Sequence, residues 1–160
     1  MAKHLTILLF VLFIGCEMNS EQLIKSENIN FENVKFNAVS KDLMFTNIEE
    51  GLEVETTKKL VKNWFNNNVK IDGFEGNLSI NVTSIKINKI KKDEYYRFEI
   101  SINIEFLETN EILNKRKIYK INSIEYGDIK GSFSIKDTEN LNKNIISNSL
   151  KSINQKVSGM

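Results

Sequence analysis

Cysteine, histidine and proline are nearly absent from this sequence of 160 residues, which has one cysteine, one histidine and no proline. A single cysteine cannot form a disulfide within the chain, so the fold must depend on its hydrophobic core. Zinc sites and general acid–base sites most often use histidine or cysteine, and the one histidine, His4, lies at the very start of the chain. The sequence therefore predicts no metal, no cofactor and no catalytic residue.

An excess of charge of one sign is also missing, because 22 basic side chains face 21 acidic ones. Nucleic-acid binding needs a basic surface that displaces the counterions of the phosphates. Anionic lipid likewise attracts clusters of lysine and arginine. We therefore expect no nucleic-acid partner and no electrostatic attachment to a membrane.

Residues 1–16 follow the order of a secretory signal peptide. Lys3 precedes an apolar run over residues 5–14, and Gly15 and Cys16 follow at once. Signal peptides have an apolar segment of ~7–15 residues, whereas a membrane-spanning helix needs ~20. The pattern predicts export and does not predict a transmembrane anchor.

The segment 13–16, Phe-Ile-Gly-Cys, resembles the lipobox of bacterial lipoprotein precursors, with Phe13 in place of the usual leucine. The resemblance implies that residues 1–15 are a signal peptide and that Cys16, the first residue of the mature chain, is acylated with fatty acids such as palmitate. These acyl chains would then hold the protein on a membrane. A plain signal peptide, or a buried strand that ends in an ordinary core cysteine, would leave Cys16 unmodified.

Residues 16–28 are expected to form a flexible tether. Residues 29–160 are expected to form one α+β domain. Alternating apolar positions predict four strands, with a bulge near Thr83 and Ser84 in the second of them. The intervening segments are polar or contain glycine and predict connections. The predicted strands cover 29–39, 78–87, 96–106 and 112–124, and the predicted connections cover 40–54, 89–94 and 126–134.

Two helices are predicted from apolar stripes at helical spacing. In residues 55–68 the stripe is Leu60, Val61, Trp64 and Phe65, and Thr56 or Thr57 is the expected N-cap. The spacing of Trp64 indicates a core residue and not an aromatic binding platform. The last helix begins at the capping residues 134–137 and continues through residue 157.

The predicted element order β-α-β-β-β-α favours a two-layer α+β sandwich, in which two helices cover one face of a mainly antiparallel sheet of about four strands. The opposite face would carry the row Arg97, Glu99, Asn103 and Glu105, and mixed charge of this kind is typical of a solvated sheet face.

Several segments read together resemble a family of uncharacterised lipoproteins of alphaproteobacteria. They are residues 47–49 (Asn-Ile-Glu), 54–56 (Val-Glu-Thr) and 63–65 (Asn-Trp-Phe), then Gly73, the paired strands and the final amphipathic helix. The element order is also similar to that of the lipopolysaccharide-assembly lipoprotein and of auxiliary lipoproteins of lipid-exporting ABC systems. The resemblance implies a small domain on an acylated cysteine that works by protein contact, and it implies no known activity.

We therefore expect a non-catalytic lipoprotein that faces the periplasm and has an assembly, scaffold or accessory role with an envelope protein partner. The periplasmic leaflet of the outer membrane is the expected location, with the inner membrane as the alternative. A lipid- or glycan-binding module is the second hypothesis, and it requires a cavity between the helices and the sheet. An enzyme is the third.

Overall fold

The computed structural model describes residues 31–159. The predicted signal peptide, Cys16 and the tether lie outside the described residues, so these three remain predictions.

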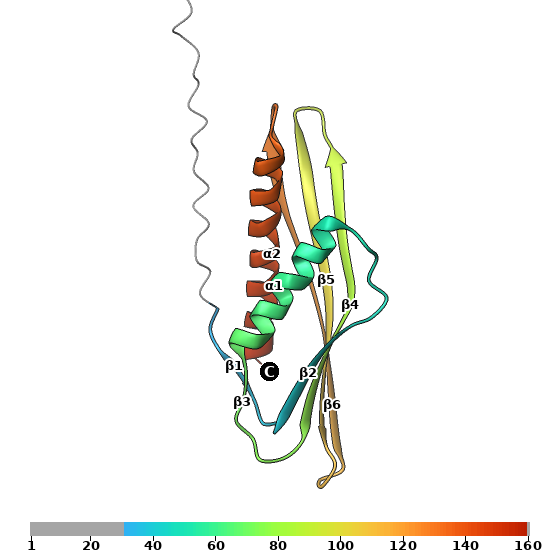
Figure 1. Cartoon of the computed structure of the whole chain (residues 1–160), viewed down its shortest axis with the longest axis vertical. Coiled ribbons are helices and arrows are strands. Elements are labelled where there is room, and N and C mark those ends of the chain that lie inside the picture. Colours follow the sequence, from blue (N-terminus) through green and yellow to red (C-terminus); the bar gives the residue numbers. More distant parts are fainter. Residues whose placement is uncertain (1–30, 160) are drawn as a thin grey trace, which may run out of the picture.

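The described chain forms two helices and six strands (Figure 1). The α+β class predicted from the sequence is therefore confirmed. In chain order the elements are β1 (Val34–Phe36), β2 (Ser40–Phe45), α1 (Leu52–Asn68), β3 (Val69–Ile71), β4 (Asn77–Lys91), β5 (Tyr95–Asn110), β6 (Lys115–Lys130) and α2 (Ile135–Ser158).

The main sheet has four strands in the order β2-β4-β5-β6. Strands β4, β5 and β6 are joined in sequence by tight hairpins and pair antiparallel, whereas β2 pairs parallel to β4. The register of β4 against β5 shifts between Val82 and Ser84, which confirms the predicted bulge. The bulge returns Ile85 and Ile87 to the face that carries Leu78, Ile80 and Val82, and a single apolar face results.

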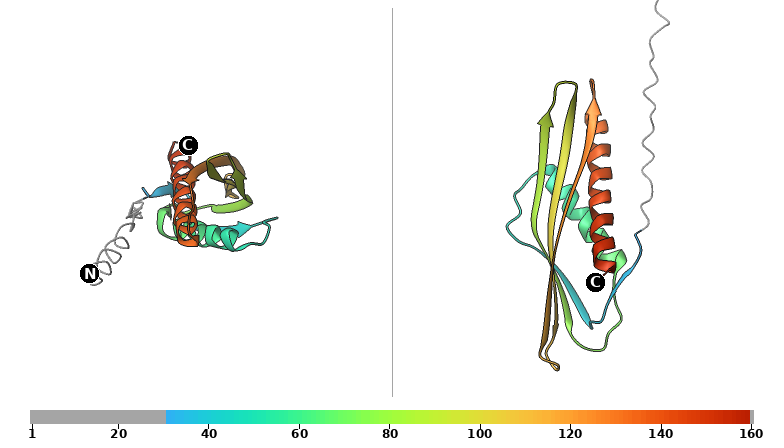
Figure 2. Two further views of the ribbon diagram at one scale, coloured as in Figure 1. Left: turned by 90° about the horizontal axis from the view of Figure 1, so that it is seen from above. Right: turned by 180° about the vertical axis from the view of Figure 1, so that it is seen from behind.

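Both helices lie on this apolar face of the sheet, as predicted (Figures 1 and 2). Helix α2 runs along β6 and β5, while α1 crosses the sheet obliquely and contacts both β4 and α2. The predicted two-layer sandwich is therefore confirmed. The β5–β6 hairpin extends past the C-terminal end of α2 (Figure 1).

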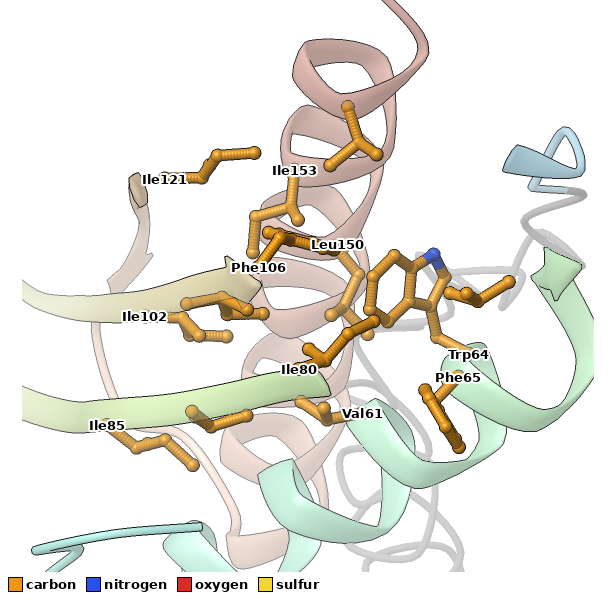
Figure 3. Close-up of a cluster of buried hydrophobic side chains, with 14 of the residues drawn as sticks. Val61, Trp64, Phe65, Ile80, Ile85, Ile102, Phe106, Ile121, Leu150 and Ile153 are labelled. Carbon is orange, nitrogen blue, oxygen red and sulfur yellow. The ribbon is translucent and has the colours of Figure 1, made fainter. Parts of the chain in front are cut away.

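Trp64 lies in the middle of the core, with 1% of its surface exposed. Its ring meets the ring of Phe106 edge to face, with centroids 6.5 Å apart, and Leu150 and Ile153 of α2 close the cluster (Figure 3). Burying aromatic side chains in this way contributes strongly to the stability of a small domain. The prediction that Trp64 is a core residue is confirmed.

Two strand predictions at the start of the domain were wrong. Of the strand expected over 29–39, the part that the structure describes, 31–39, contains only the short strand β1 (Val34–Phe36), which pairs parallel with β3 outside the main sheet. Residues 40–45 were expected to be part of an irregular connection, but they form the edge strand β2. A six-residue edge strand with one solvated face carries few apolar residues, so its sequence signal is weak.

Lys41 of β2 contributes a long-range contact that no local pattern indicates. Its ammonium donates hydrogen bonds to the carbonyls of Phe65 and Val69, and so binds the C-terminal end of α1, where the last turn has no basic residue. Burial, together with the nearby charge of Lys70, lowers the pKa of Lys41 below its usual value. A cation is favourable at this end of a helix because the free carbonyls there carry partial negative charge.

The N-cap expected for the first helix was also wrong. Helix α1 begins one turn earlier, after Gly51, which provides no side-chain hydrogen bond. Thr56 and Thr57 lie inside the helix, where their hydroxyls donate to the carbonyls of Leu52 and Glu53. In contrast, the predicted capping residues of α2 are confirmed, because Ser134 and Asp137 form a reciprocal capping box.

Candidate functional site

The predicted lipidation site, Cys16, lies outside the residues that the structure describes. Within residues 31–159, no group of three or more histidine, cysteine, aspartate or glutamate side chains is placed to hold a metal ion. In the same part of the chain, none of the helices has the length and hydropathy to cross a bilayer. Two surface features of the described chain are candidate sites: one on each face of the sheet.

The first feature lies on the outward face, where the sequence predicted a solvated row. Arg97 of β5 donates two hydrogen bonds to Asp128 of β6, at 2.8 and 2.9 Å. The guanidinium also lies 4.3 Å from the ring centre of Tyr126 and 5.8 Å from that of Tyr95. These contacts raise the pKa of Arg97 and lower the pKa of Asp128, chiefly through the hydrogen bonds between the two.

Exposed apolar side chains surround this ion pair. Tyr126 is 62% exposed and Ile124, two residues earlier on the same face of β6, is 56% exposed. Ile90 of β4 lies directly opposite Arg97 in the sheet register. We call this group the Arg97 patch: Ile90, Tyr95, Arg97, Ile124, Tyr126 and Asp128. Tyrosine, arginine and aliphatic residues around a fixed ion pair have the composition of protein-interface hot spots.

The second feature is a cleft of about 500 Å³ on the helical side of the sheet. It lies where the first turn of α1, the first three turns of α2 and the end of β4 come together. This volume is within the range of ~300–1,000 Å³ that small-molecule sites usually have. Its lining is Leu52, Glu53, Thr56, Lys89, Phe133, Ser134, Ile135, Thr138, Glu139, Asn142, Lys143 and Ile146.

Lys89 is the residue of the sheet that lines the cleft, and it is charged. It lies directly opposite Phe98 in the register of β4 and β5 and therefore in the inward-facing row, which Ile85 and Ile87 also occupy. Its ammonium lies 4.8–5.4 Å from the ring centres of Tyr96, Phe98 and Phe133. Among the described residues, it has no carboxylate within salt-bridge distance.

Asn142 of α2 is the buried polar residue of the cleft. It is 5% exposed, and its side-chain oxygen has no hydrogen-bond partner among the described residues. Buried amide oxygens are almost always hydrogen-bonded, because an unpaired one loses its interaction with water and gains nothing. This oxygen is shielded from solvent, so a ligand in the cleft would reach it only if the side chain turned toward the cleft.

Sequence reasoning placed Arg97 on the outward face correctly but missed both features as sites. Lys89 was assigned to a polar turn over 89–94, whereas β4 continues to Lys91. The sequence did contain a signal for Lys89. Beyond the bulge, Ile85, Ile87 and Lys89 occupy every second position of the strand, and side chains two residues apart in a strand share a face. Asn142 gives no local signal of a site, because nothing in the sequence of α2 indicates that the first helix and the end of β4 meet it.

No family model and no curated protein matches the chain, so membership of the alphaproteobacterial family remains a prediction. Among solved structures, the chain is similar to a minor lipoprotein from Acinetobacter baumannii, with 12% identity, a TM-score of 0.43, and coverage of 81% of this chain and 94% of that one. An uncharacterised lipoprotein B from Nitrosomonas europaea has 11% identity and a TM-score of 0.42 over 77% and 88% of the two chains. The rare lipoprotein B from Shewanella oneidensis has 10% identity and a TM-score of 0.39 over 74% and 89%. Similarities as low as these carry no argument about function.

Proposed function

We propose that this chain is a bacterial envelope lipoprotein. Residues 1–15 are removed, Cys16 is acylated, and the domain faces the periplasm from the inner leaflet of the outer membrane, with the inner membrane as the alternative. The order of charged start, apolar run, Gly15 and Cys16 is the observation that carries this proposal. Two or more acyl chains anchor a protein stably, at about 0.8 kcal/mol for each buried CH₂ group.

The anchor is tested by intact-mass analysis of the chain from bacterial membranes, with native Cys16 and with Cys16→Ala. We expect the native chain to lack residues 1–15, to carry the mass of acyl chains and to sediment with membranes. Separation of inner from outer membranes then assigns the location. A native chain that is uncut, unacylated and present in the aqueous fraction would overturn the proposal.

The role of the domain in this proposal is non-catalytic, namely to bind a protein partner of the envelope as an accessory or assembly component. The Arg97 patch supports this role, because arginine and tyrosine at the centre of an interface often account for most of its binding energy. The ion pair is already formed within the domain. The patch is thus organised before a partner arrives, which lowers the entropy lost on binding.

Site-specific photo-crosslinking in cells tests this role. A photoreactive amino acid replaces Tyr126 in the patch or, as the control, Lys151 on the exposed face of α2. We expect a protein adduct of reproducible mass at position 126, absent at 151 and reduced by Arg97→Ser. If no adduct forms at position 126, or if equal adducts form at both positions, the patch is not the docking surface.

The cleft favours a second candidate function, in which the chain is a lipid- or glycan-binding module, for instance an auxiliary lipoprotein of an envelope lipid-transport system. Its walls include Leu52, Phe133, Ile135 and Ile146. These apolar residues favour a ligand with an aliphatic chain, because such a chain would remove their apolar surface from water. The same anchored chain could have both properties, because the Arg97 patch and the cleft lie on opposite faces of the sheet.

A further inference from the structure

We propose that the cleft binds an anionic single-chain amphiphile, with the aliphatic chain between the helices and the anionic group at Lys89. The inference deepens the second candidate function above by naming its ligand. It does not depend on acylation of Cys16 or on the Arg97 patch. The lipid anchor, the protein-docking role of the patch and the ligand of the cleft can therefore each fail separately.

The mouth of the cleft exposes apolar side chains that a ligand would cover. Leu52 begins α1 and Ile135 begins α2, and each is 81% exposed while lining the cleft. Deeper in the cleft, Ile146 is fully buried and Phe133 is half-buried. An aliphatic chain that contacts all four would remove apolar surface from water on both partners, which is the main driving force for binding of this kind.

Lys89 selects the charge of the ligand. Its ammonium lies against the ring of Phe133, which lines the cleft, and against the rings of Tyr96 and Phe98 beside it; it has no carboxylate partner among the described residues. A carboxylate or sulfate that entered from the mouth would form a charge-assisted hydrogen bond with this ammonium. Lys143 adds a second positive charge at the rim.

The rim also carries two acids, Glu53 and Glu139. Glu53 is in the first turn of α1 and Glu139 in the second turn of α2; both are exposed, as Lys89 is, so water screens all three charges. Lys89 differs from them in position, because it projects from the sheet in the inward-facing row. The inference therefore assigns the anionic group to Lys89, and a cationic ligand of the same chain length is the decisive comparison.

Asn142 adds a second chemical feature to the expected ligand. Its side-chain oxygen has no partner among the described residues and is shielded from solvent, so it would accept a hydrogen bond from a ligand once the side chain turns toward the cleft. A hydroxyl or an amide N–H on the ligand near its anionic end would satisfy this oxygen. We expect such a ligand to bind more tightly than the plain chain of equal length.

The test uses the full chain with Cys16→Ala and a fluorescent probe, dansylated undecanoate. Dodecanoate and dodecyl sulfate compete for the probe, and dodecyltrimethylammonium is the cationic comparison, all below their micelle concentrations. We expect both anions to displace the probe at micromolar concentration, and the cation to require at least about 10-fold more, as a charge-assisted hydrogen bond implies.

Four variants, one of them a control, locate the site. Lys89→Gln should weaken dodecanoate binding about 10-fold and Lys89→Arg should retain it, because arginine keeps the charge and donates the same kind of hydrogen bond. Lys86→Gln is the matched control, since Lys86 is exposed on the other face of the same strand. Thr56→Trp places an indole on the cleft wall and should abolish binding. Circular dichroism and thermal unfolding confirm that each variant is folded.

Equal affinity for the cationic and anionic ligands, or equal losses from Lys89→Gln and Lys86→Gln, would overturn the assignment of Lys89. Binding that Thr56→Trp leaves unchanged would place the ligand outside the cleft, and absence of probe binding would remove the proposal altogether. If acylation fails but the cleft binds dodecanoate, the anchor is wrong and the ligand assignment stands.

Discussion

Trp64 and Asn154 are 90 positions apart in the sequence and meet in the core, where the indole Nε1 donates to the Asn154 side-chain oxygen at 2.9 Å. The amide nitrogen of Asn154 in turn donates to the backbone carbonyl of Glu32 at 3.0 Å. One buried amide therefore joins α1, α2 and the segment that leads into β1. These are the elements that the sheet register alone does not position.

We predict that Asn154→Leu lowers the free energy of unfolding by about 1–3 kcal/mol, because it leaves the buried indole N–H without an acceptor. Urea unfolding followed by circular dichroism measures the change. The double variant Trp64→Phe/Asn154→Leu should cost less than the sum of the two single variants, since Trp64→Phe removes the donor that Asn154→Leu alone leaves unpaired. Strict additivity would show that the hydrogen bond is energetically unimportant.

The parts of the fold that follow from local periodicity were predictable. The stripe through Trp64 predicted α1, and the alternation along β5 predicted a sheet with one buried face. The capping box at Ser134 predicted the start of α2. Each of these signals lies within a window of a few residues, and each is a direct consequence of helix or strand geometry.

The parts that depend on distant partners were not predictable. The β1–β3 and β2–β4 pairs are parallel and join segments on either side of α1. No residue within β2 indicates that its neighbour begins at Asn77, and half of its side chains face solvent. Lys89 and Asn142 become parts of one cleft only when the ends of both helices lie over the end of β4.

Gly127 shows how one residue can mislead a local interpretation. Together with Gly131 it predicted a loop over 126–134, but β6 continues to Lys130. The position lacks a side chain because α2 packs on it: an added Cβ would lie 2.6 Å from Leu141 Cδ1 and 3.2 Å from Ile145 Cγ1. A glycine in a strand often marks such a close approach.

We therefore predict that Gly127→Ala destabilises the domain by about 1–3 kcal/mol, because Leu141 and Ile145 must move to admit the methyl group. Thermal unfolding measures the loss. Gly51→Ser is the matched control, since its Cβ would meet only Val54, at an ordinary contact distance of 3.8 Å, and a serine N-cap should be neutral or stabilising by a few tenths of a kcal/mol. A larger loss at Gly51 than at Gly127 would contradict the packing argument.

Asn142→Leu should raise the free energy of unfolding, whereas Gly127→Ala should lower it. It removes a buried oxygen that has no partner among the described residues, and leucine extends the apolar wall of the cleft. We expect a gain of about 1–3 kcal/mol in the free energy of unfolding, which is the usual cost of leaving such a group unpaired. Urea unfolding without ligand measures it, and Asn154→Leu is the internal comparison because the oxygen and the nitrogen of that amide each have a hydrogen-bond partner. A loss of stability would show that the Asn142 oxygen is already satisfied.

The capping box of α2 predicts a dependence of stability on pH. Ser134 donates to Asp137 through its hydroxyl, at 2.7 Å, and through its backbone N–H, at 2.8 Å, and these bonds lower the pKa of Asp137 below its usual value. Because the pKa of the folded state is below that of the unfolded state, the carboxylate stabilises the fold fully above its unfolded-state pKa. This contribution is lost as the pH falls through the lowered folded-state pKa.

Asp137→Asn should therefore have a lower melting temperature than the native domain at pH 7, and the difference should shrink as the pH falls below the usual range for an aspartate. Thermal unfolding at intervals from neutral to acidic pH measures this convergence. Glu139→Gln, two residues along the same helix, is the control and should follow the native curve, since no hydrogen bond to its side chain is found among the described residues. If the difference at Asp137 stays constant on acidification, the carboxylate charge does not contribute, and the stability of the helix start depends on Ser134 alone.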